Sequence, residues 1–114
     1  MNEKVLKSLF DIKLAIHEID SFLPSIGISF PEYKSNLMLK RAIERNLEII
    51  GEAMNRIIKE DPGFPIQEAL RIVGLRNQII HAYDSISDEN IWAIIINHLP
   101  KLRSEVDKLT EEYE

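Results

Sequence analysis

The residues best suited to chemistry gather in one stretch, residues 75–84, which reads LRNQIIHAYD. Arg76 offers a planar, permanently charged fork of donors that suits a phosphate. His81 has the side chain whose ordinary pKa suits proton transfer near neutral pH. Asn77 lies about one helical turn before His81, where its amide could orient the imidazole or cap a helix end. With the hydroxyl of Tyr83, this set of side chains could act on a phosphate.

A straight helix would not bring these groups together. At about 100° per residue, Arg76 and Tyr83 lie about 20° apart on one face, whereas His81 points about 140° away from Arg76. The two could act on one phosphate only if the helix ends or distorts near His81, or if two copies of the chain face each other across a symmetric interface. The geometry therefore favours a homodimer.

Each of these residues also has an ordinary structural explanation. A typical arginine such as Arg76 is solvated or ion-paired, and a lone helical histidine such as His81 is more often structural than catalytic. Tyr83 could be a core tyrosine with a satisfied hydroxyl. His17 and His98 have no partner at metal-ligand spacing, so we expect both to be structural or surface residues. Spacing alone leaves the choice open.

The acidic residues form no cluster of the kind that holds a magnesium ion. Three glutamates instead interleave with three arginines on the second expected helix, as a solvated face with i,i+4 ion pairs. These residues are Glu44, Glu48, Glu52, Arg41, Arg45 and Arg56. We therefore expect metal-free chemistry, with no metal site and no cofactor. Near the last helix, Trp92 is expected to be a packing anchor rather than a base-stacking platform.

Length and composition limit the kind of protein. A chain of 114 residues fits one domain, so residues 1–114 are expected to form a single helical domain. The absence of cysteine removes disulfide frameworks, thiolate zinc sites and thiol nucleophiles. The longest apolar run, residues 91–96, is far shorter than the ~20 residues that span a bilayer, and Asp11 and Glu18 interrupt any signal peptide. We expect a soluble, cytoplasmic protein.

Charge is distributed unevenly along the chain. The net charge of −5 argues against bulk attraction to nucleic acid or to an anionic membrane. Residues 34–83, however, carry eight Lys or Arg and six Asp or Glu, a local charge of +2 that leaves −7 for the remainder. Local patches therefore matter more than the total.

Four helices are expected to position the motif. The first has apolar residues at alternating spacings of four and three, namely Val5, Leu9, Ile12, Ile16, Ile19 and Leu23. Pro24 and Gly27 end it, and residues 24–31 are expected to form a connection. The second helix is expected from about Lys34 to Lys59, with an apolar face wide enough to touch two neighbours. That face consists of Leu39, Ile43, Leu47, Ile50, Met54 and Ile57, with Ala42, Ile49 and Ala53 beside them.

The third helix leads into the motif. It follows an Asp-Pro-Gly stop at residues 61–63, and its buried face is expected to consist of Ile66, Ala69, Leu70, Val73 and Ile80. Gly74 permits close approach of the backbone to a neighbour or to a substrate.

The fourth helix has a well-marked start. Ser87 is expected to be its N-cap, with Asp88 and Glu89 in the first turn favouring the helix dipole and Ile86 forming a hydrophobic staple. Its buried stripe is expected to be Ile91, Ile94, Ile95, His98, Leu99, Leu102, Val106 and Leu109. Pro100 predicts a kink. Because no strand pattern appears, the predicted fold class is all-α, an antiparallel bundle of four main helices.

The motif resembles a known signature. Arg76, four further residues, His81, Ala82 and Tyr83 match the Arg-x4-His-x-Tyr pattern of HepT-like toxins, a branch of the HEPN (higher eukaryotes and prokaryotes nucleotide-binding) superfamily. Residues 41–53 resemble the second helix of this family, and residues 91–100 resemble its last helix. The resemblance covers nearly the whole chain and implies an all-α dimer whose motif lines a cleft between protomers.

The resemblance also implies an activity. Family members are typically metal-independent RNases. In this chain Arg76 would bind and stabilise the scissile phosphate, and His81 would move a proton to or from the attacking 2′-hydroxyl or the leaving oxygen. Asn77 would support the site. Asp84 stands where many members have an aromatic residue, and its carboxylate could repel RNA or orient His81.

A partner is implied as well. In type VII-like toxin-antitoxin pairs, a minimal nucleotidyltransferase antitoxin, MntA, silences the toxin by transferring AMP to the motif tyrosine, here Tyr83. AMP on that hydroxyl, on the same helical stripe as Arg76, would block the cleft by its charge and bulk. With a local charge of only +2, an RNase of this sequence is expected to contact few phosphates and to bind with a shallow salt dependence.

Two other functions stay open. A non-enzymatic module that docks a nucleotidyltransferase partner would form a stable complex without RNase activity. A bundle whose only role is dimerisation is compatible with the helical periodicity, but it leaves Arg76, Asn77, His81 and Tyr83 unexplained.

Overall fold

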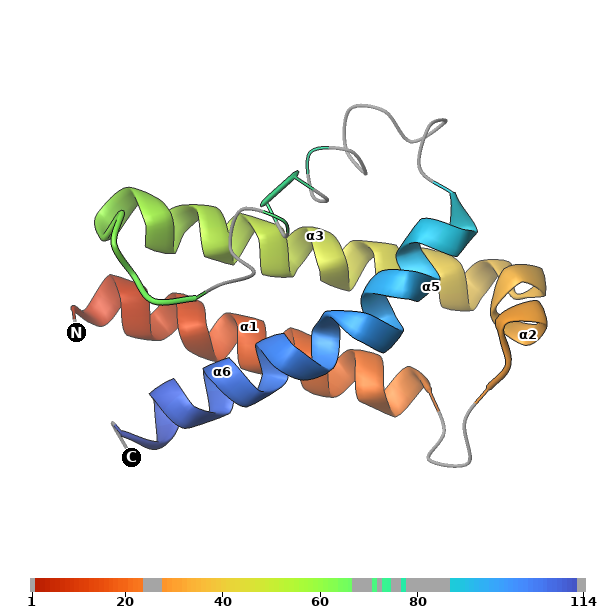
Figure 1. The fold of residues 1–114 in the computed structure, drawn as a ribbon, viewed down its shortest axis with the longest axis horizontal. Coiled ribbons are helices and arrows are strands. Elements are labelled where there is room, and N and C mark those ends of the chain that lie inside the picture. Colours follow the sequence, from red (N-terminus) through yellow and green to blue (C-terminus); the bar gives the residue numbers. More distant parts are fainter. Residues whose placement is uncertain are drawn as a thin grey trace.

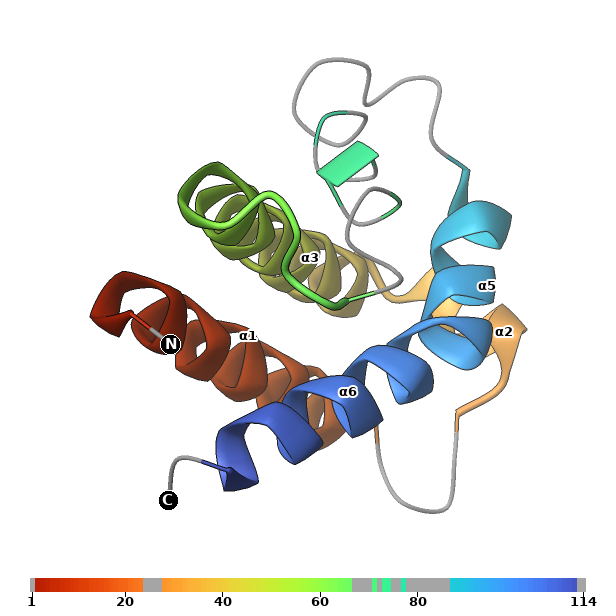
Figure 2. The same ribbon diagram turned by 60° about the vertical axis from the view of Figure 1, so that its left-hand side comes forward.

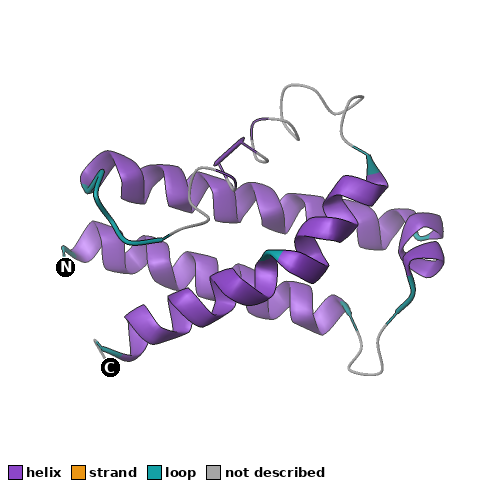
Figure 3. Cartoon of the chain, in the orientation of Figure 1, coloured by secondary structure: helices purple, strands orange, loops and turns teal. Residues whose placement is uncertain are grey.

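The described part of the molecule consists of helices joined by loops. The computed structural model describes residues 2–23, 28–66, 71, 73–74, 77 and 87–112. Its helices are α1 (Glu3–Phe22), α2 (Phe30–Ser35), α3 (Leu37–Glu60), α5 (Asp88–Asn97) and α6 (Leu99–Glu111). No strand occurs within those ranges (Figure 3). The all-α prediction is confirmed.

Two long helices form the centre of the fold. Helices α1 and α3 lie side by side and antiparallel, so the start of α1 is next to the end of α3 (Figures 1 and 2). Helix α6 packs across α1, α5 continues from α6 at an angle, and the short α2 packs against α3. Helix α1 begins and α6 ends at the same end of the bundle (Figure 1).

Helix α1 matches the sequence prediction closely. The side chain of Asn2 accepts a hydrogen bond from the backbone N–H of Val5 at 2.8 Å and so caps the helix start. The predicted stripe is buried, with Leu23 half-buried at the C-terminal end. Its buried members are Val5, Leu9, Ile12, Ile16 and Ile19. The helix ends at Phe22, just before Pro24, as expected.

The second predicted helix is two helices. Ser29 caps α2 by accepting a hydrogen bond from the N–H of Glu32, and Pro31 occupies the first turn, where its missing N–H is not needed. Asn36 then ends α2 and caps α3, accepting from the N–H of Leu39 at 3.0 Å. The predicted connection through residue 31 and the start near Lys34 are therefore wrong. The caps formed by Ser29 and Asn36 set the starts of two separate helices.

Helix α3 supplies as many buried apolar residues to the described core as α1 does. Its fully buried apolar residues are Ile43, Leu47, Ile50, Ala53, Met54 and Ile57, all from the predicted face. Leu39, Ala42 and Ile49 from the same face are half-buried. A polar residue joins them, because Asn46 is buried and donates from Nδ2 to the carbonyl of Ala15 on α1 at 3.4 Å.

The predicted kink near Pro100 is confirmed as a break between α5 and α6. His98 ends α5 and precedes α6, and Pro100 lies in the first turn of α6. Proline cannot donate the backbone hydrogen bond that would continue the helix. Beyond the break, Leu99, Leu102 and Val106 complete the core. No helix in the described ranges is long and apolar enough to cross a membrane.

Candidate functional site

Most of the predicted motif lies outside the described residues. Arg76, His81, Tyr83 and Asp84 are among those that are not described, so their convergence and their roles stay predictions. Asn77 is described, and it is helical and exposed. The candidate site is therefore built from the elements that hold the two ends of residues 67–86.

The described part of the third predicted helix has the expected orientation. Val73 is half-buried and packs against the core, whereas Arg71, Gly74 and Asn77 are exposed. Positions three residues apart lie on one side of a helix, so this side faces outward. A Cβ at Gly74 would meet no described atom within 4 Å.

A tight turn and a buried anchor fix the start of the segment. The N–H of Asp61 donates to the carbonyl of Ile57 at 2.8 Å and closes α3, and the N–H of Phe64 donates to the carbonyl of Asp61 at 3.0 Å. Ile66 then enters the core with 6% of its surface exposed, as predicted. Ala69, Leu70 and Ile80, the other predicted core residues of this helix, lie outside the described ranges.

The other end of the segment is fixed to α3 through the start of α5. Ser87 caps α5 as predicted, its Oγ accepting from the N–H of Asn90 at 3.1 Å. Lys40 of α3 donates from Nζ to the carboxylate of Asp88 at 3.3 Å, and these side chains are only 18% and 24% exposed. Such partial burial weakens solvent screening, so this pair holds α5 to α3 more effectively than a surface pair would.

The neighbouring Glu89 is arranged differently. It pairs with Lys34 of α2 at 3.4 Å, and both side chains are largely exposed. The pKa of Glu89 lies below its usual value, chiefly because its carboxylate accepts a hydrogen bond from its own backbone N–H, and secondly because Lys34 donates to it. Both effects keep Glu89 ionised, so it is unsuited to acid catalysis near neutral pH.

An aromatic cluster surrounds the junction of α2, α3 and α5. Tyr33 is fully buried and meets the indole of Trp92 edge to face, with ring centroids 5.3 Å apart. Phe30 lies 5.9 Å from Trp92 in a tilted arrangement. Trp92 thus packs as an anchor, as predicted.

The hydroxyl of Tyr33 lies in an unusual environment. It has no hydrogen-bond partner among the described residues. Burial raises the pKa of this phenol well above its ordinary value, and the nearby carboxylates of Glu44 and Asp88 raise it further. Tyr33 is therefore a neutral packing group, not a proton donor for catalysis.

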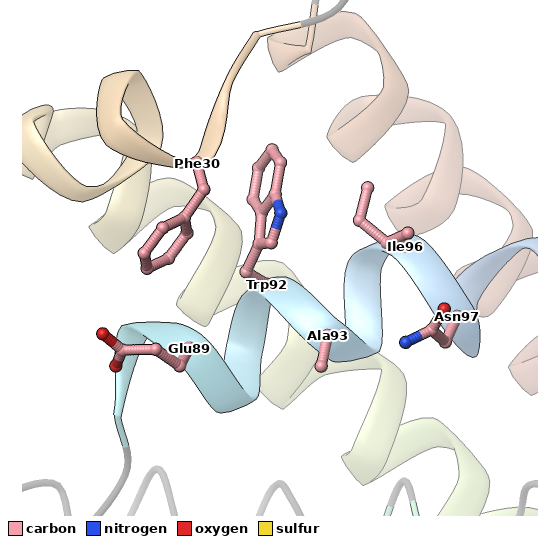
Figure 4. A pocket seen from close by; sticks show the side chains of 6 residues that line it. All are labelled: Phe30, Glu89, Trp92, Ala93, Ile96 and Asn97. Atoms are coloured by element: carbon pink, nitrogen blue, oxygen red, sulfur yellow. The ribbon is translucent and has the colours of Figure 1, made fainter.

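A shallow pocket opens beside this cluster (Figure 4). It has a volume of about 260 Å³ and lies between the start of α2 and one face of α5. Its lining is Phe30, Glu89, Trp92, Ala93, Ile96 and Asn97. Because Glu89 is its single ionisable group, the pocket could bind a ligand but contains no acid–base pair for chemistry.

The charged face of α3 is paired, but not at the predicted spacing. Arg41 contacts Glu44 at 3.0 Å and Arg45 contacts Glu48 at 3.2 Å, so the pairs are i,i+3 rather than i,i+4. Arg56, expected to join this series, instead contacts Asp11 of α1 at 3.3 Å.

No group of three or more potential metal ligands occurs in the described part of the chain. His17 is exposed and His98 is half-buried at the break between α5 and α6. Both positions agree with the structural or surface roles predicted for these histidines.

Sequence reasoning missed several residues around the ends of the segment. Tyr33, Lys40 and Phe30 were not singled out, although Phe30 and Tyr33 follow a serine cap at the i,i+3 spacing of one helical face. Nothing local reveals the contact between Lys40 and Asp88, because the two residues are 48 positions apart.

Comparisons with known proteins bear on what this arrangement is for. The model of one protein family, described as Ribonuclease HepT-like, matches residues 12–109. A protein of Methanocaldococcus jannaschii named "Putative RNase MJ1380" is 35% identical over 113 residues, which cover 94% of this chain and 98% of that protein. A protein of Thermococcus cleftensis named "Probable ribonuclease HepT" is 31% identical over 105 residues, covering 89% and 91%. No solved structure matches.

Proposed function

This chain belongs to the HepT-like ribonuclease family, a branch of the HEPN superfamily, and on that premise we propose that it is a metal-independent endoribonuclease. The observation that carries the proposal is the signature Arg76-x4-His81-x-Tyr83 within a family match that spans residues 12–109. The exposed side of the helix at Gly74 and Asn77 supports it, because a substrate can reach that side.

The proposed reaction uses the 2′-hydroxyl of RNA as the nucleophile. Its oxygen attacks the adjacent phosphorus and loses its proton, the bond from phosphorus to the 5′-oxygen breaks, and that oxygen gains a proton. Arg76 binds the phosphate and stabilises the charge that develops on it, and His81 carries one of the two protons. Asn77 supports the site. The products are a 2′,3′-cyclic phosphate and a 5′-hydroxyl.

We further propose that the active form is a homodimer. Leu37 and Met38, at the start of α3, are 58% and 86% exposed, an unusual state for large apolar side chains. The contact between Lys40 and Asp88 places the start of α3 beside the start of α5, which follows residues 67–86 in the chain. A second copy covering this patch would supply the symmetric interface that is one of the two arrangements able to bring Arg76 and His81 to one phosphate.

We propose a toxin role in a type VII-like toxin-antitoxin pair, with regulation through Tyr83. A cognate nucleotidyltransferase antitoxin of the MntA kind would transfer AMP to this hydroxyl. The attached phosphate would then compete with RNA for Arg76, which an ideal helix would place on the same stripe as Tyr83. Silencing and cleavage would thus use one short segment.

Incubation of purified protein with RNA in EDTA tests the nuclease. Wild type should cut RNA without a divalent ion, and His81→Ala should cut at least about a hundredfold more slowly, the usual contribution of a positioned acid or base. Uncut RNA with wild type, or equal cutting by His81→Ala, would refute the nuclease. A stable complex with the nucleotidyltransferase without any cutting would support the alternative function, a binding module that docks this partner.

The intact mass of protein co-expressed with the nucleotidyltransferase tests the regulation. An increase by whole AMP units that is absent in Tyr83→Phe is expected. If the mass does not change, or changes equally in Tyr83→Phe, AMP transfer to Tyr83 is wrong while the nuclease assay stands unaffected.

A further inference from the structure

A second hollow of about 280 Å³ lies far from the aromatic cluster, between the start of α1 and the end of α3. It is lined by Lys4, Lys7, Ser8, Arg56, Lys59 and Glu60. Four of these six side chains are cations, in a chain whose net charge is −5. We call this hollow the basic groove.

The four cations are arranged as two matched pairs. Lys4 and Lys7 lie three residues apart on α1, and Arg56 and Lys59 lie three residues apart on α3. Residues at this spacing are neighbours on a helix surface, about 4.5 Å apart along the axis. Because α1 and α3 lie side by side, each wall of the groove contains two cationic residues.

One cation of the groove, Arg56, is held in place by contacts within the fold, and the lysine side chains of α1 are more exposed. Arg56 donates from Nε to Oγ of the buried Ser8 at 3.3 Å and from Nη2 to the carboxylate of Asp11 at 3.3 Å, so its guanidinium is held in place. Lys4 and Lys7 are 81% and 74% exposed at their side chains. Such exposed ammonium groups can reach a ligand without breaking buried contacts.

Carboxylates near the groove reduce its charge without cancelling it. Glu60 lies 3.7 Å from Lys4, and Asp11 lies 2.7 Å from Lys7, so the four cations face two anions. Lys59 is exposed and has no ion pair within the described ranges. The groove thus keeps an excess of positive charge, and exposed surface pairs such as these are weak enough to exchange for a phosphate.

Two other hollows among the described residues are lined by acidic rather than basic side chains. The pocket beside Trp92 has Glu89 as its single charged residue. A third hollow, of about 330 Å³, contains Asp61 and Glu112 and no cation. The basic groove is therefore the place among these three hollows where an anion would concentrate.

We propose that the basic groove binds the phosphate backbone of single-stranded RNA, outside the Arg76 and His81 motif. The choice of RNA rests on the proposed function, and the groove itself favours it over an acidic protein because its lining contains no aromatic or large apolar anchor. Residues 61–66 lead from this end of α3 into the motif segment.

Binding of a fluorescent single-stranded oligonucleotide with 2′-O-methyl groups tests the proposal, because this probe lacks the nucleophile for cleavage. The test variant is Lys4→Gln/Lys59→Gln, and the matched control is Lys101→Gln/Lys108→Gln, which removes the same charge from two exposed positions of α6. Anisotropy titrations at several salt concentrations should show about tenfold weaker binding for the test variant at low salt, and a salt slope smaller by about 1.4, which corresponds to two phosphate contacts. The control should match wild type.

Equal affinities of both variants and wild type would overturn the proposal, and so would equal weakening by both variants, which would indicate a general charge effect. Polyglutamate binding to wild type as tightly as the oligonucleotide would overturn RNA in favour of an acidic protein. The proposed nuclease is judged separately. If the groove is wrong, RNA cutting still depends on His81; if the nuclease is wrong, probe binding still depends on Lys4 and Lys59.

Discussion

The two ends of the α1–α3 pair differ in almost every respect. At the basic end, where α1 begins and α3 ends, the surface is hollow and is lined by Lys4, Lys7, Arg56 and Lys59. At the aromatic end, where α2, α3 and α5 begin, Phe30, Tyr33 and Trp92 pack against one another. One end has a groove with an excess of cations, whereas the other packs around a buried ring beside a pocket whose single charged residue is Glu89.

This difference indicates that the two ends of the helix pair have separate roles. Residues 67–86 connect the two ends along the chain, since they follow Ile66 beyond the end of α3 and precede Ser87 at the start of α5. Packing at the aromatic end can fix the position of the segment, and the charges at the basic end can hold an anionic substrate that reaches it. Stability and substrate binding should therefore respond to substitutions at opposite ends.

Truncation of the buried ring should give the largest effect on stability. Tyr33→Ala is expected to lower the free energy of unfolding by about 3–5 kcal/mol, as for other fully buried aromatic residues, because it leaves a cavity between α2, α3 and α5. Lys4→Gln/Lys59→Gln should change it by less than about 0.5 kcal/mol, since both side chains are exposed. Urea unfolding followed by circular dichroism measures both. Similar losses in the free energy of unfolding at the two ends would refute these separate roles.

Charge reversal should separate the two ends in RNA binding. Lys4 pairs with Glu60 at 3.7 Å and Lys34 pairs with Glu89 at 3.4 Å, so each is an exposed lysine beside a glutamate, one at each end. Lys4→Glu is expected to weaken binding of the methylated probe about tenfold, through loss of a phosphate contact and added repulsion. Lys34→Glu should have little effect in the same anisotropy assay. If Lys34→Glu weakens binding as much, net charge rather than the groove governs affinity.

The half-buried ion pair at the aromatic end should contribute more than its exposed neighbour. Asp88→Asn removes the partner of Lys40 and is expected to lower the free energy of unfolding by about 1 kcal/mol, a value discounted for the remaining solvent exposure. Glu89→Gln removes an equal charge from the same helical turn but breaks only the exposed pair with Lys34, so its loss should be smaller. Chemical denaturation of both variants measures these two losses of stability. Equal losses would mean that the helix dipole, not the pair with Lys40, accounts for the effect.

Local signals made much of the fold predictable. The spacing of Leu9, Ile12 and Ile16 sets the buried face of α1, Ser87 caps α5, and Pro100 breaks the last helix, because each acts over one or two turns. The division at Asn36 was missed because the predicted apolar face begins only at Leu39 and the capping roles of Ser29 and Asn36 were not recognised.

The candidate site was less predictable because its parts meet through tertiary contacts. The motif could be read from residues 75–84, and its family from that motif together with residues 41–53 and 91–100. The partners of Lys40 and Arg56 could not, since Asp88 and Asp11 come from other helices. The basic groove depends on the same pairing of distant helices, so charge patterns along α1 or α3 alone do not reveal it.

A small effect at neutral pH should come from removing the hydroxyl of Tyr33, and this change tests whether water reaches the aromatic end. This hydroxyl is buried without a described hydrogen-bond partner, so Tyr33→Phe should change the free energy of unfolding by less than about 1 kcal/mol at pH 7. Burial raises the pKa of the phenol in the folded protein above its ordinary value of 10.0. The unfolded chain therefore releases this proton first as pH rises.

Because the unfolded chain loses the phenol proton at a lower pH than the folded protein, alkaline pH should reduce the stability of wild type. The stability that Tyr33 contributes is fully present below about pH 10 and decreases above it, by at most about 1.4 kcal/mol per pH unit. Tyr33→Phe lacks the ionisable group. Its free energy of unfolding relative to that of wild type should therefore increase between pH 9 and about pH 11 in urea titrations. If the two proteins lose stability in parallel, the phenol ionises as readily in the folded state as in the unfolded chain, and the aromatic end must admit water.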